Sequence, residues 1–205
     1  MRGLIGKKIG MTRVFNSGGR AIPVTVLEVG PCYVTQVKTI ENDGYDSVQI
    51  GYLESKSKHV NKPMAGHFLK NNVKPTKFLA EFQKVPKFDY KPGKVFNVSL
   101  FNEGDLVSVS GKSKGHGFSG TVKKYNFSTQ RKTHGQGDTY RHVGSIGNAS
   151  DPSRVFPGKK MPGRYGNKTV SVKSLEVIKI NEHKNQLLVK GSVPGSTNGI
   201  VVITR

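Results

Sequence analysis

Residues 22–53, IPVTVLEVGPCYVTQVKTIENDGYDSVQIGYL, decide the fold class. They form three runs rich in β-branched residues, at 22–29, 32–39 and 46–53, which Gly30-Pro31 and Asn42-Asp43-Gly44 separate. Short β-branched runs between turn residues are typical of strands and predict a β-meander. Apolar and polar residues alternate imperfectly in the second run, so its inward face stays open, and the pattern fits a barrel and a sandwich equally.

Further strand patterns follow on both sides of a polar interruption. Strands are predicted at 94–98, 105–110 and 169–180, and 186–190 with 200–203 predicts a C-terminal hairpin and a closing strand. Residues from about 55 to 91 are rich in lysine, asparagine and proline, which predicts an insertion with a short helix and one strand. The globular body is therefore mainly β and is built from two halves, residues 1–110 and 169–205.

Residues 111–168 separate these halves and have a different character. Apolar periodicity is nearly absent there, glycine is frequent, and lysine and arginine far outnumber the two acids, Asp138 and Asp151. Such a segment cannot bury a core of its own, and a long irregular run inside a compact domain is usually misassigned, disordered or functional. We interpret it as an extended, non-globular loop that another molecule orders.

The overall charge indicates what that molecule is. The chain has 33 lysines and arginines against 13 acids, a net charge of +20, which favours a polyanionic partner. No run approaches the roughly eighteen apolar residues of a spanning helix, and the N-terminus lacks the continuous apolar core of a secretory signal. We therefore expect nucleic acid rather than a membrane, and a cytoplasmic protein. Cys32 excludes an internal disulfide because it is the only cysteine, and its apolar neighbours predict burial.

Aromatic residues are interleaved with the cations of the long loop. Cations neutralise phosphates, aromatic rings and guanidinium planes stack on unpaired bases, and glycine allows close backbone approach, so this mixture favours RNA. The alternative is a solvated basic loop whose rings dock back on the body. The rings are Phe118, Tyr125, Phe127, Tyr140, Phe156 and Tyr165.

Motifs that would indicate an enzyme are incomplete. Gly115-His-Gly-Phe-Ser-Gly120 matches G-x-G-x-x-G, but no apolar-periodic helix follows, so the dinucleotide-binding context is missing. Gly111-Lys-Ser113 resembles the end of a P-loop, yet Leu106 stands where the first glycine belongs. The six histidines have no metal-ligand spacing, and no catalytic constellation is present. We expect no catalytic residue, no metal, no cofactor and no small-molecule substrate.

Three motifs identify a resemblance to a known family. Gly3-Leu-Ile-Gly-Lys-Lys-Ile-Gly-Met-Thr12, Gly111-Lys-Ser-Lys-Gly-His-Gly-Phe-Ser-Gly120 and the stretch 144–163, GSIGNASDPSRVFPGKKMPG, resemble signatures of the ribosomal protein L3 family. The resemblance spans almost the whole chain, including the C-terminal residues 187–195, and is to the shorter bacterial type. An organellar ribosome is also compatible with it.

The resemblance implies a six-stranded β-barrel of the translation-factor type with a small α/β insertion, and a long central extension that reaches toward the peptidyl transferase centre. It also implies early binding near the 3′ end of the large-subunit RNA, a part in starting subunit assembly, and neighbouring large-subunit proteins as partners. Composition alone does not establish these points. It does indicate a β body interrupted by a basic, glycine-rich loop, and the two accounts agree.

The expected rRNA-binding residues are the cations of the N-terminal motif together with the cations and histidines of the extension. They are Lys7, Lys8, Lys112, Lys114, His116, Lys123, Lys124, Arg131, Lys132, His134, Arg141, His142, Arg154, Lys159, Lys160, Arg164 and Lys168. The resemblance places the tip of the extension at Gly147, Asn148, Ala149 and Ser150. Asn148 stands where some members carry a methylated glutamine, and Lys124 stands where the family usually has arginine, so it lacks the planar fork of that residue.

Two rival functions are compatible with a basic β protein. A nucleic-acid-modifying enzyme would show turnover and would need acid, base or metal ligands that the sequence does not offer. A general DNA-binding architectural protein would bind duplex DNA and ribosomal RNA with equal affinity.

Overall fold

The structure is a computed structural model that describes residues 3–16, 18–85 and 89–205. The chain divides into two compact units. The first contains residues 1–113 and 169–205, and the second contains residues 114–168.

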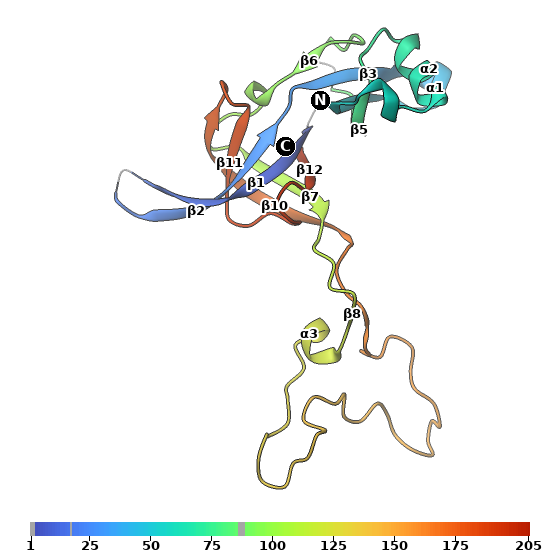
Figure 1. The fold of residues 1–205 in the computed structure, drawn as a ribbon, viewed down its shortest axis with the longest axis vertical. Coiled ribbons are helices and arrows are strands. Elements are labelled where there is room, and N and C mark those ends of the chain that lie inside the picture. Colours follow the sequence, from blue (N-terminus) through green and yellow to red (C-terminus); the bar gives the residue numbers. More distant parts are fainter. Residues whose placement is uncertain (1–2, 17, 86–88) are drawn as a thin grey trace. The chain divides into compact units, whose positions relative to one another are not determined.

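A closed antiparallel β-barrel forms the centre of the first unit (Figure 1). Its strands, in the order in which they pair, are β1 (Gly3–Phe15), β12 (Ile200–Thr204), β7 (Leu106–Lys112), β10 (Thr169–Asn181), β11 (Gln186–Lys190) and β2 (Ala21–Val29). The mainly β class and the six-stranded barrel are thereby confirmed.

Every second side chain of the barrel strands β7, β11 and β12 is buried in the barrel interior. Val107 and Val109 of β7, Leu187 and Val189 of β11, and Ile203 of β12 are fully buried, and the residues between them are more exposed. Successive side chains of a strand point to opposite faces, so every second residue enters the interior. Burial of these aliphatic side chains is the main stabilising contribution to the barrel.

A second antiparallel sheet packs beside the barrel within the same unit. Its order is β5 (Thr76–Gln83), β4 (Ser47–Glu54), β3 (Cys32–Lys38) and β6 (Val95–Phe96). The three strands predicted within residues 22–53 are present, but the predicted meander is wrong. Strand β2 pairs with β1 and β11 in the barrel, and the two residues Gly30-Pro31 carry the chain into the other sheet.

A bulge explains the imperfect alternation in β3. Val34 pairs with Ile50 and Gln36 pairs with Gln49, so Thr35 is the extra residue. A bulge places two successive residues on the same side of the strand, and both Val34 and Thr35 are buried. The Thr35 hydroxyl is satisfied because it lies 3.2 Å from the Gln49 carbonyl oxygen.

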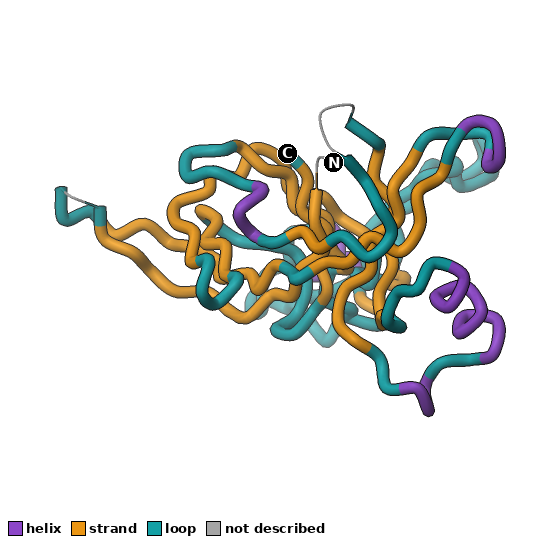
Figure 2. The backbone as a smooth tube through the Cα atoms, turned by 90° about the horizontal axis from the view of Figure 1, so that it is seen from above, coloured by secondary structure: helices purple, strands orange, loops and turns teal. Residues whose placement is uncertain are grey.

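Strand β1 escaped prediction, and the strand predicted at 94–98 is largely wrong. Glycines and lysines obscure the β1 pattern, yet Gly6 is required there, because a β-carbon would lie 2.8 Å from the carbonyl oxygen of Glu28. Only Val95–Phe96 is strand in the other segment, and the chain continues as the 3₁₀ turn η2 (Val98–Leu100). Beyond the barrel, β1 and β2 continue as a two-stranded hairpin (Figure 2).

Short helices connect the strands of the second sheet. The turn expected after β3 is the one-turn helix α1 (Ile40–Asp43), which ends at Gly44 with φ 80°. The insertion contains the 3₁₀ turn η1 (Ser57–His59) and helix α2 (Lys62–Lys70), and β5 follows, so the predicted short helix and strand are present. None of the helices in the described ranges is long and apolar enough to cross a membrane.

Two polar contacts join the barrel to the sheet. The Cys32 thiol donates to the Ile5 carbonyl oxygen at 3.4 Å, and the Tyr52 hydroxyl donates to the Glu28 carbonyl oxygen at 3.3 Å. Both side chains belong to one hydrophobic cluster with the barrel interior. The predicted burial of Cys32 is confirmed, and burial raises the pKa of its thiol to about 12.

The buried Cys32 thiol is expected to make the free energy of unfolding depend on pH in the alkaline range. The unfolded thiol ionises near its ordinary pKa of 9.0 and the folded one near 12, so above pH 9 the native state holds the extra proton. The free energy of unfolding then falls as pH rises, by at most about 1.4 kcal/mol per pH unit. Urea unfolding of the chain and of Cys32→Ala should differ by a constant amount below pH 9 and converge above it. A constant difference from pH 8 to pH 11 would contradict the assignment.

Candidate nucleic-acid interface

The second unit has little regular structure. It contains strand β8 (Phe118–Ser119), the one-turn helix α3 (Thr121–Tyr125) and strand β9 (Gly163–Arg164), and the rest is turns and loops. Helix α3 follows the glycine motif and was not predicted, but it is a single turn with only Thr121 buried. It is therefore too short to serve as the helix of a dinucleotide-binding unit.

A short ladder joins the two ends of this unit. Strand β8 pairs with β9, the His116 amide donates to the Tyr165 carbonyl oxygen at 2.9 Å, and the Tyr165 amide donates to the Gly117 carbonyl oxygen at 3.0 Å. The His116 ring stacks on the Tyr165 ring, with centroids 5.1 Å apart and planes 20° from parallel. The ladder therefore fixes the orientation of His116, one of the expected RNA-binding residues.

Glycine is obligatory at one position of this ladder. Gly166 has φ +75°, and a β-carbon there would overlap the carbonyl oxygen of Lys114. Both observations exclude other residues, because positive φ is strained for a residue with a β-carbon. The close approach of the two segments thus depends on Gly166.

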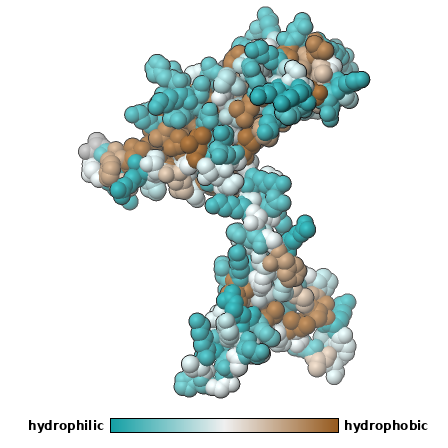
Figure 3. All heavy atoms as spheres, in the orientation of Figure 1, coloured by the Kyte–Doolittle hydropathy of each residue, from teal (hydrophilic) through white to brown (hydrophobic). Residues whose placement is uncertain are grey.

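Positive charge in the second unit is dense. Its 55 residues carry eleven lysines and arginines against two aspartates, a net charge of +9, whereas the other 150 residues carry +11. All eleven cations except Lys124 are exposed. Within residues 114–167, all of which the structure describes, no carboxylate lies within 4.0 Å of a lysine or arginine nitrogen. In Figure 3, hydrophilic side chains of this unit lie beside pale and hydrophobic ones.

Several of these cations lie over aromatic rings. The Lys124 and Lys160 ammonium groups are 5.0 Å and 5.8 Å from the centroid of the Tyr125 ring, and the Arg154 guanidinium is 5.4 Å from that of Phe156. Phe118 is 79% exposed, which is unusual for a large apolar ring. Cations and exposed rings on one surface suit phosphates and unstacked bases.

A hollow of about 450 Å³ brings two of the expected residues together. Arg141 and His142 line it with Thr121, and the remaining walls are Gly120, Val143, Gly144 and Pro162. The Thr121 hydroxyl is buried and has no hydrogen-bond partner among the residues that the structure describes. A buried hydroxyl without a partner is unfavourable by about 1–3 kcal/mol, so a ligand that bonds to it is stabilised.

Three of the expected cations lie in the first unit instead. Lys7 and Lys8 are on β1, and Lys112, which is exposed, pairs with Thr169 at the end of β7. The Lys8 ammonium donates to the carbonyl oxygens of Val193 and Gly195, at 2.7 and 3.1 Å. These two bonds tie β1 to the loop between β11 and β12.

The other expected residues are spread over the loops of the second unit. His134, with φ +61°, and Arg131 and Lys132 are exposed and lie on a different turn from the hollow. Residues 147–150, the expected tip, are all exposed, and the Ser145 hydroxyl donates to the Gly147 carbonyl oxygen at 3.1 Å. The part of the chain that the structure describes holds no cluster of three or more metal-ligating side chains.

The lysines of the insertion were visible in the sequence, but they were not predicted to form a site. Residues 54–77 contain six lysines against one acid, Glu54, and three of these lysines (Lys56, Lys58 and Lys77) line a pocket. The charge of this window would have indicated a basic surface. The pocket itself depends on pairing between distant strands and was not predictable.

Comparison with known proteins places the chain in a family. The family model described as Ribosomal protein L3 matches residues 85–187. Large ribosomal subunit protein uL3 of Thermotoga maritima is 48% identical over 203 residues, which cover 99% of this chain and 96% of that protein. The uL3 protein of Chlorobium phaeobacteroides is 50% identical over 204 residues, or 99% and 98%. The protein uL3c of Phaeodactylum tricornutum is 48% identical over 201 residues, or 98% and 97%.

These matches extend over nearly the whole chain at about half identity, and they agree with the three motifs and the closed barrel. The family is a structural component of the ribosome rather than an enzyme. The prediction of a bacterial-type ribosomal protein without enzymatic function is therefore confirmed. The chain belongs to the ribosomal protein L3 family.

Proposed function

We propose that this chain is a structural constituent of the large ribosomal subunit that binds large-subunit rRNA directly, chiefly through residues 111–168. The observation that carries the proposal is the net charge of +9 on the second unit, without a carboxylate beside any cation of residues 114–167. Each lysine or arginine that contacts a phosphate releases a condensed counterion, and this release drives association.

Binding also orders the extension. Only Ser119 and Thr121 are buried in this unit, so it has almost no core to hold it in one conformation. Fixing the backbone of a residue costs roughly 1–2 kcal/mol, and RNA contacts must offset this. The barrel therefore docks on one RNA region, while the extension orders on others and neutralises phosphates where RNA helices crowd together.

The family relationship extends this proposal to the ribosome as a whole. Neighbouring large-subunit proteins are partners, residues 147–150 form the end of the extension nearest the peptidyl transferase centre, and early binding of the chain helps to start subunit assembly. All four residues 147–150 are exposed, which is compatible with this placement.

Binding to defined RNA fragments over a salt series tests the function. The chain should bind one or a few fragments of large-subunit rRNA selectively, and the slope of log K against log salt should fall by about 0.7–0.9 for each phosphate contact. Duplex DNA and small-subunit rRNA are the competitors. Equal affinity for duplex DNA would favour an architectural DNA-binding protein, and turnover of the RNA at stoichiometric protein would favour a modifying enzyme.

A single methyl group at Gly166 is expected to weaken this binding. Gly166→Ala introduces both left-handed strain and overlap with Lys114, so the ladder between β8 and β9 opens. A disturbance of about 1–2 kcal/mol raises the dissociation constant for rRNA by roughly 5–30-fold.

Gly137→Ala provides the matched control. Gly137 does not have a positive φ and has no atom within 4 Å of an added β-carbon, so this variant should bind like the unmodified chain. Urea unfolding of the barrel should be the same in both variants. Equal rRNA affinity in both would contradict the role of the ladder.

A further inference from the structure

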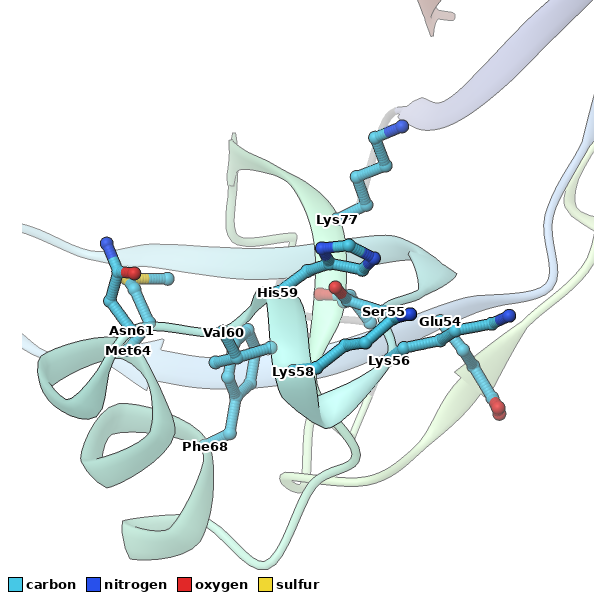
Figure 4. Close-up of a pocket in the computed structure, with 11 residues that line it drawn as sticks. Glu54, Ser55, Lys56, Lys58, His59, Val60, Asn61, Met64, Phe68 and Lys77 are labelled. Carbon is cyan, nitrogen blue, oxygen red and sulfur yellow. The ribbon is translucent and has the colours of Figure 1, made fainter.

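The insertion in the first unit contains a pocket of about 650 Å³ that the proposed function does not use (Figure 4). Its walls come from the end of β4, from η1, from α2 and from the start of β5. Backbone hydrogen bonds hold these walls. The Ser55 amide donates to the Pro75 carbonyl oxygen at 2.9 Å, and the Val60 amide donates to the Ser57 carbonyl oxygen at 3.1 Å. The pocket is therefore preformed.

The rim of the pocket is cationic. Lys56, Lys58 and Lys77 line it, and the one acid among the lining residues, Glu54, lies 3.4 Å from a lysine outside it, Lys74. In the view of Figure 4 the ammonium groups of Lys56 and Lys58 extend toward the same side. No described carboxylate lies within 4.0 Å of either group. An anionic group is the complementary ligand.

The floor of the pocket is apolar except for one hydroxyl group, that of Thr76. Phe68 is 2% exposed, Met64 is 38% exposed, and the exposed ring of His59 forms part of the wall. Thr76 is 6% exposed, and its hydroxyl has no hydrogen-bond partner among the described residues. A ligand for this pocket needs a flat apolar face, a hydrogen-bonding edge and a negative charge.

A nucleotide combines these three features, because a base has a stackable face and a polar edge and its phosphate is anionic. We propose that this pocket binds one unstacked nucleotide of the RNA, with its base against His59 and Met64 and its phosphate at Lys56 and Lys58. An acidic peptide segment would also match the lysines, and the acetylation experiment below distinguishes it from a nucleotide. This proposal rests on the proposed function in one respect, namely that the chain binds RNA.

Two double variants distinguish a specific phosphate contact in the pocket from a general effect of positive charge on rRNA binding. Lys56→Gln with Lys58→Gln removes two pocket cations, and Lys62→Gln with Lys70→Gln removes two exposed cations of the same insertion that do not line the pocket. The first pair should flatten the log–log salt slope for rRNA by about 0.7–0.9 per lost phosphate contact. The control pair should leave the slope unchanged. An equal change in both pairs would overturn the pocket contact.

Ultraviolet crosslinking identifies the occupant. The full chain in complex with large-subunit rRNA is irradiated, digested with nuclease and protease, and searched for peptides that carry a nucleotide. Adducts are expected within residues 54–77 and within the extension. The pocket variant Lys56→Gln with Lys58→Gln should weaken the first set and retain the second.

The two sets of adducts make failures distinguishable. Adducts in the extension without any in residues 54–77 would overturn the pocket proposal and leave the proposed function standing. Adducts in neither place, with no selective rRNA binding, would overturn the proposed function itself. If the pocket lysines are protected from acetylation in whole subunits but not by rRNA alone, a protein segment is the occupant and the nucleotide proposal is wrong.

Discussion

Replacing residues 113–168 by Asn-Gly is expected to lower the affinity for large-subunit rRNA by at least about a hundredfold near 0.1 M salt, because each phosphate contact contributes about 0.7–0.9 to the log–log slope. Loss of only three contacts is enough for a change of this order. The replacement removes eleven cations and two acids. The slope itself should flatten by the same 0.7–0.9 per contact, measured by filter binding between about 0.05 and 0.2 M salt.

The barrel should tolerate this replacement. Lys112 of β7 lies opposite Thr169 of β10, so a two-residue turn can close the hairpin between them, and Asn-Gly suits such a turn. Urea unfolding of the shortened chain provides the control for folding. A shortened chain that unfolds normally and keeps the full salt slope would show that the extension does not contact phosphates.

Truncation of one barrel side chain is expected to have the largest effect on stability. Leu187 of β11 is 0% exposed and belongs to the central hydrophobic cluster. Leu187→Ala should lower the free energy of unfolding by about 2–5 kcal/mol, the range for a buried leucine that leaves a cavity. Urea unfolding followed by far-ultraviolet circular dichroism measures the loss.

The neighbouring residue provides a matched control. Leu188 lies on the opposite face of the same strand and is only half-buried, so Leu188→Ala should cost clearly less than Leu187→Ala. Equal losses would mean that the alternation of β11 does not define the barrel interior.

Local patterns predicted the strands but not their partners. The β-branched runs located β2, β3, β4, β7, β10, β11 and β12 to within a few residues, because period-two burial is a local property. The meander prediction failed because neighbours in sequence are not necessarily neighbours in a sheet. Strand β2 pairs with β11, more than 150 residues later in the chain. Strand β1 was missed because neighbouring strands approach Gly3 and Gly6 so closely that only glycine fits there. These glycines hide the alternation of apolar and polar residues that indicates a strand.

Composition predicted the chemistry of the candidate interface but not its geometry. The excess of cations and the interleaved rings were visible in the sequence of residues 111–168. The stack of His116 on Tyr165 and the hollow beside Arg141 and His142 bring together residues that lie about 20 to 50 positions apart, and no local pattern encodes such contacts. Lys8 was expected at the RNA, and its bonds to Val193 and Gly195 show a structural role that its charge alone did not suggest.

Hydrogen–deuterium exchange of residues 114–168, without and with large-subunit rRNA, tests the central claim most directly, because the claim is that RNA orders this unit. We predict fast amide exchange in the loops of the unit outside the β8–β9 ladder in the free chain, slow exchange there in the complex, and little change in the barrel strands. Slow exchange of these loops in the free chain, or fast exchange that persists in a saturated complex, would contradict this claim.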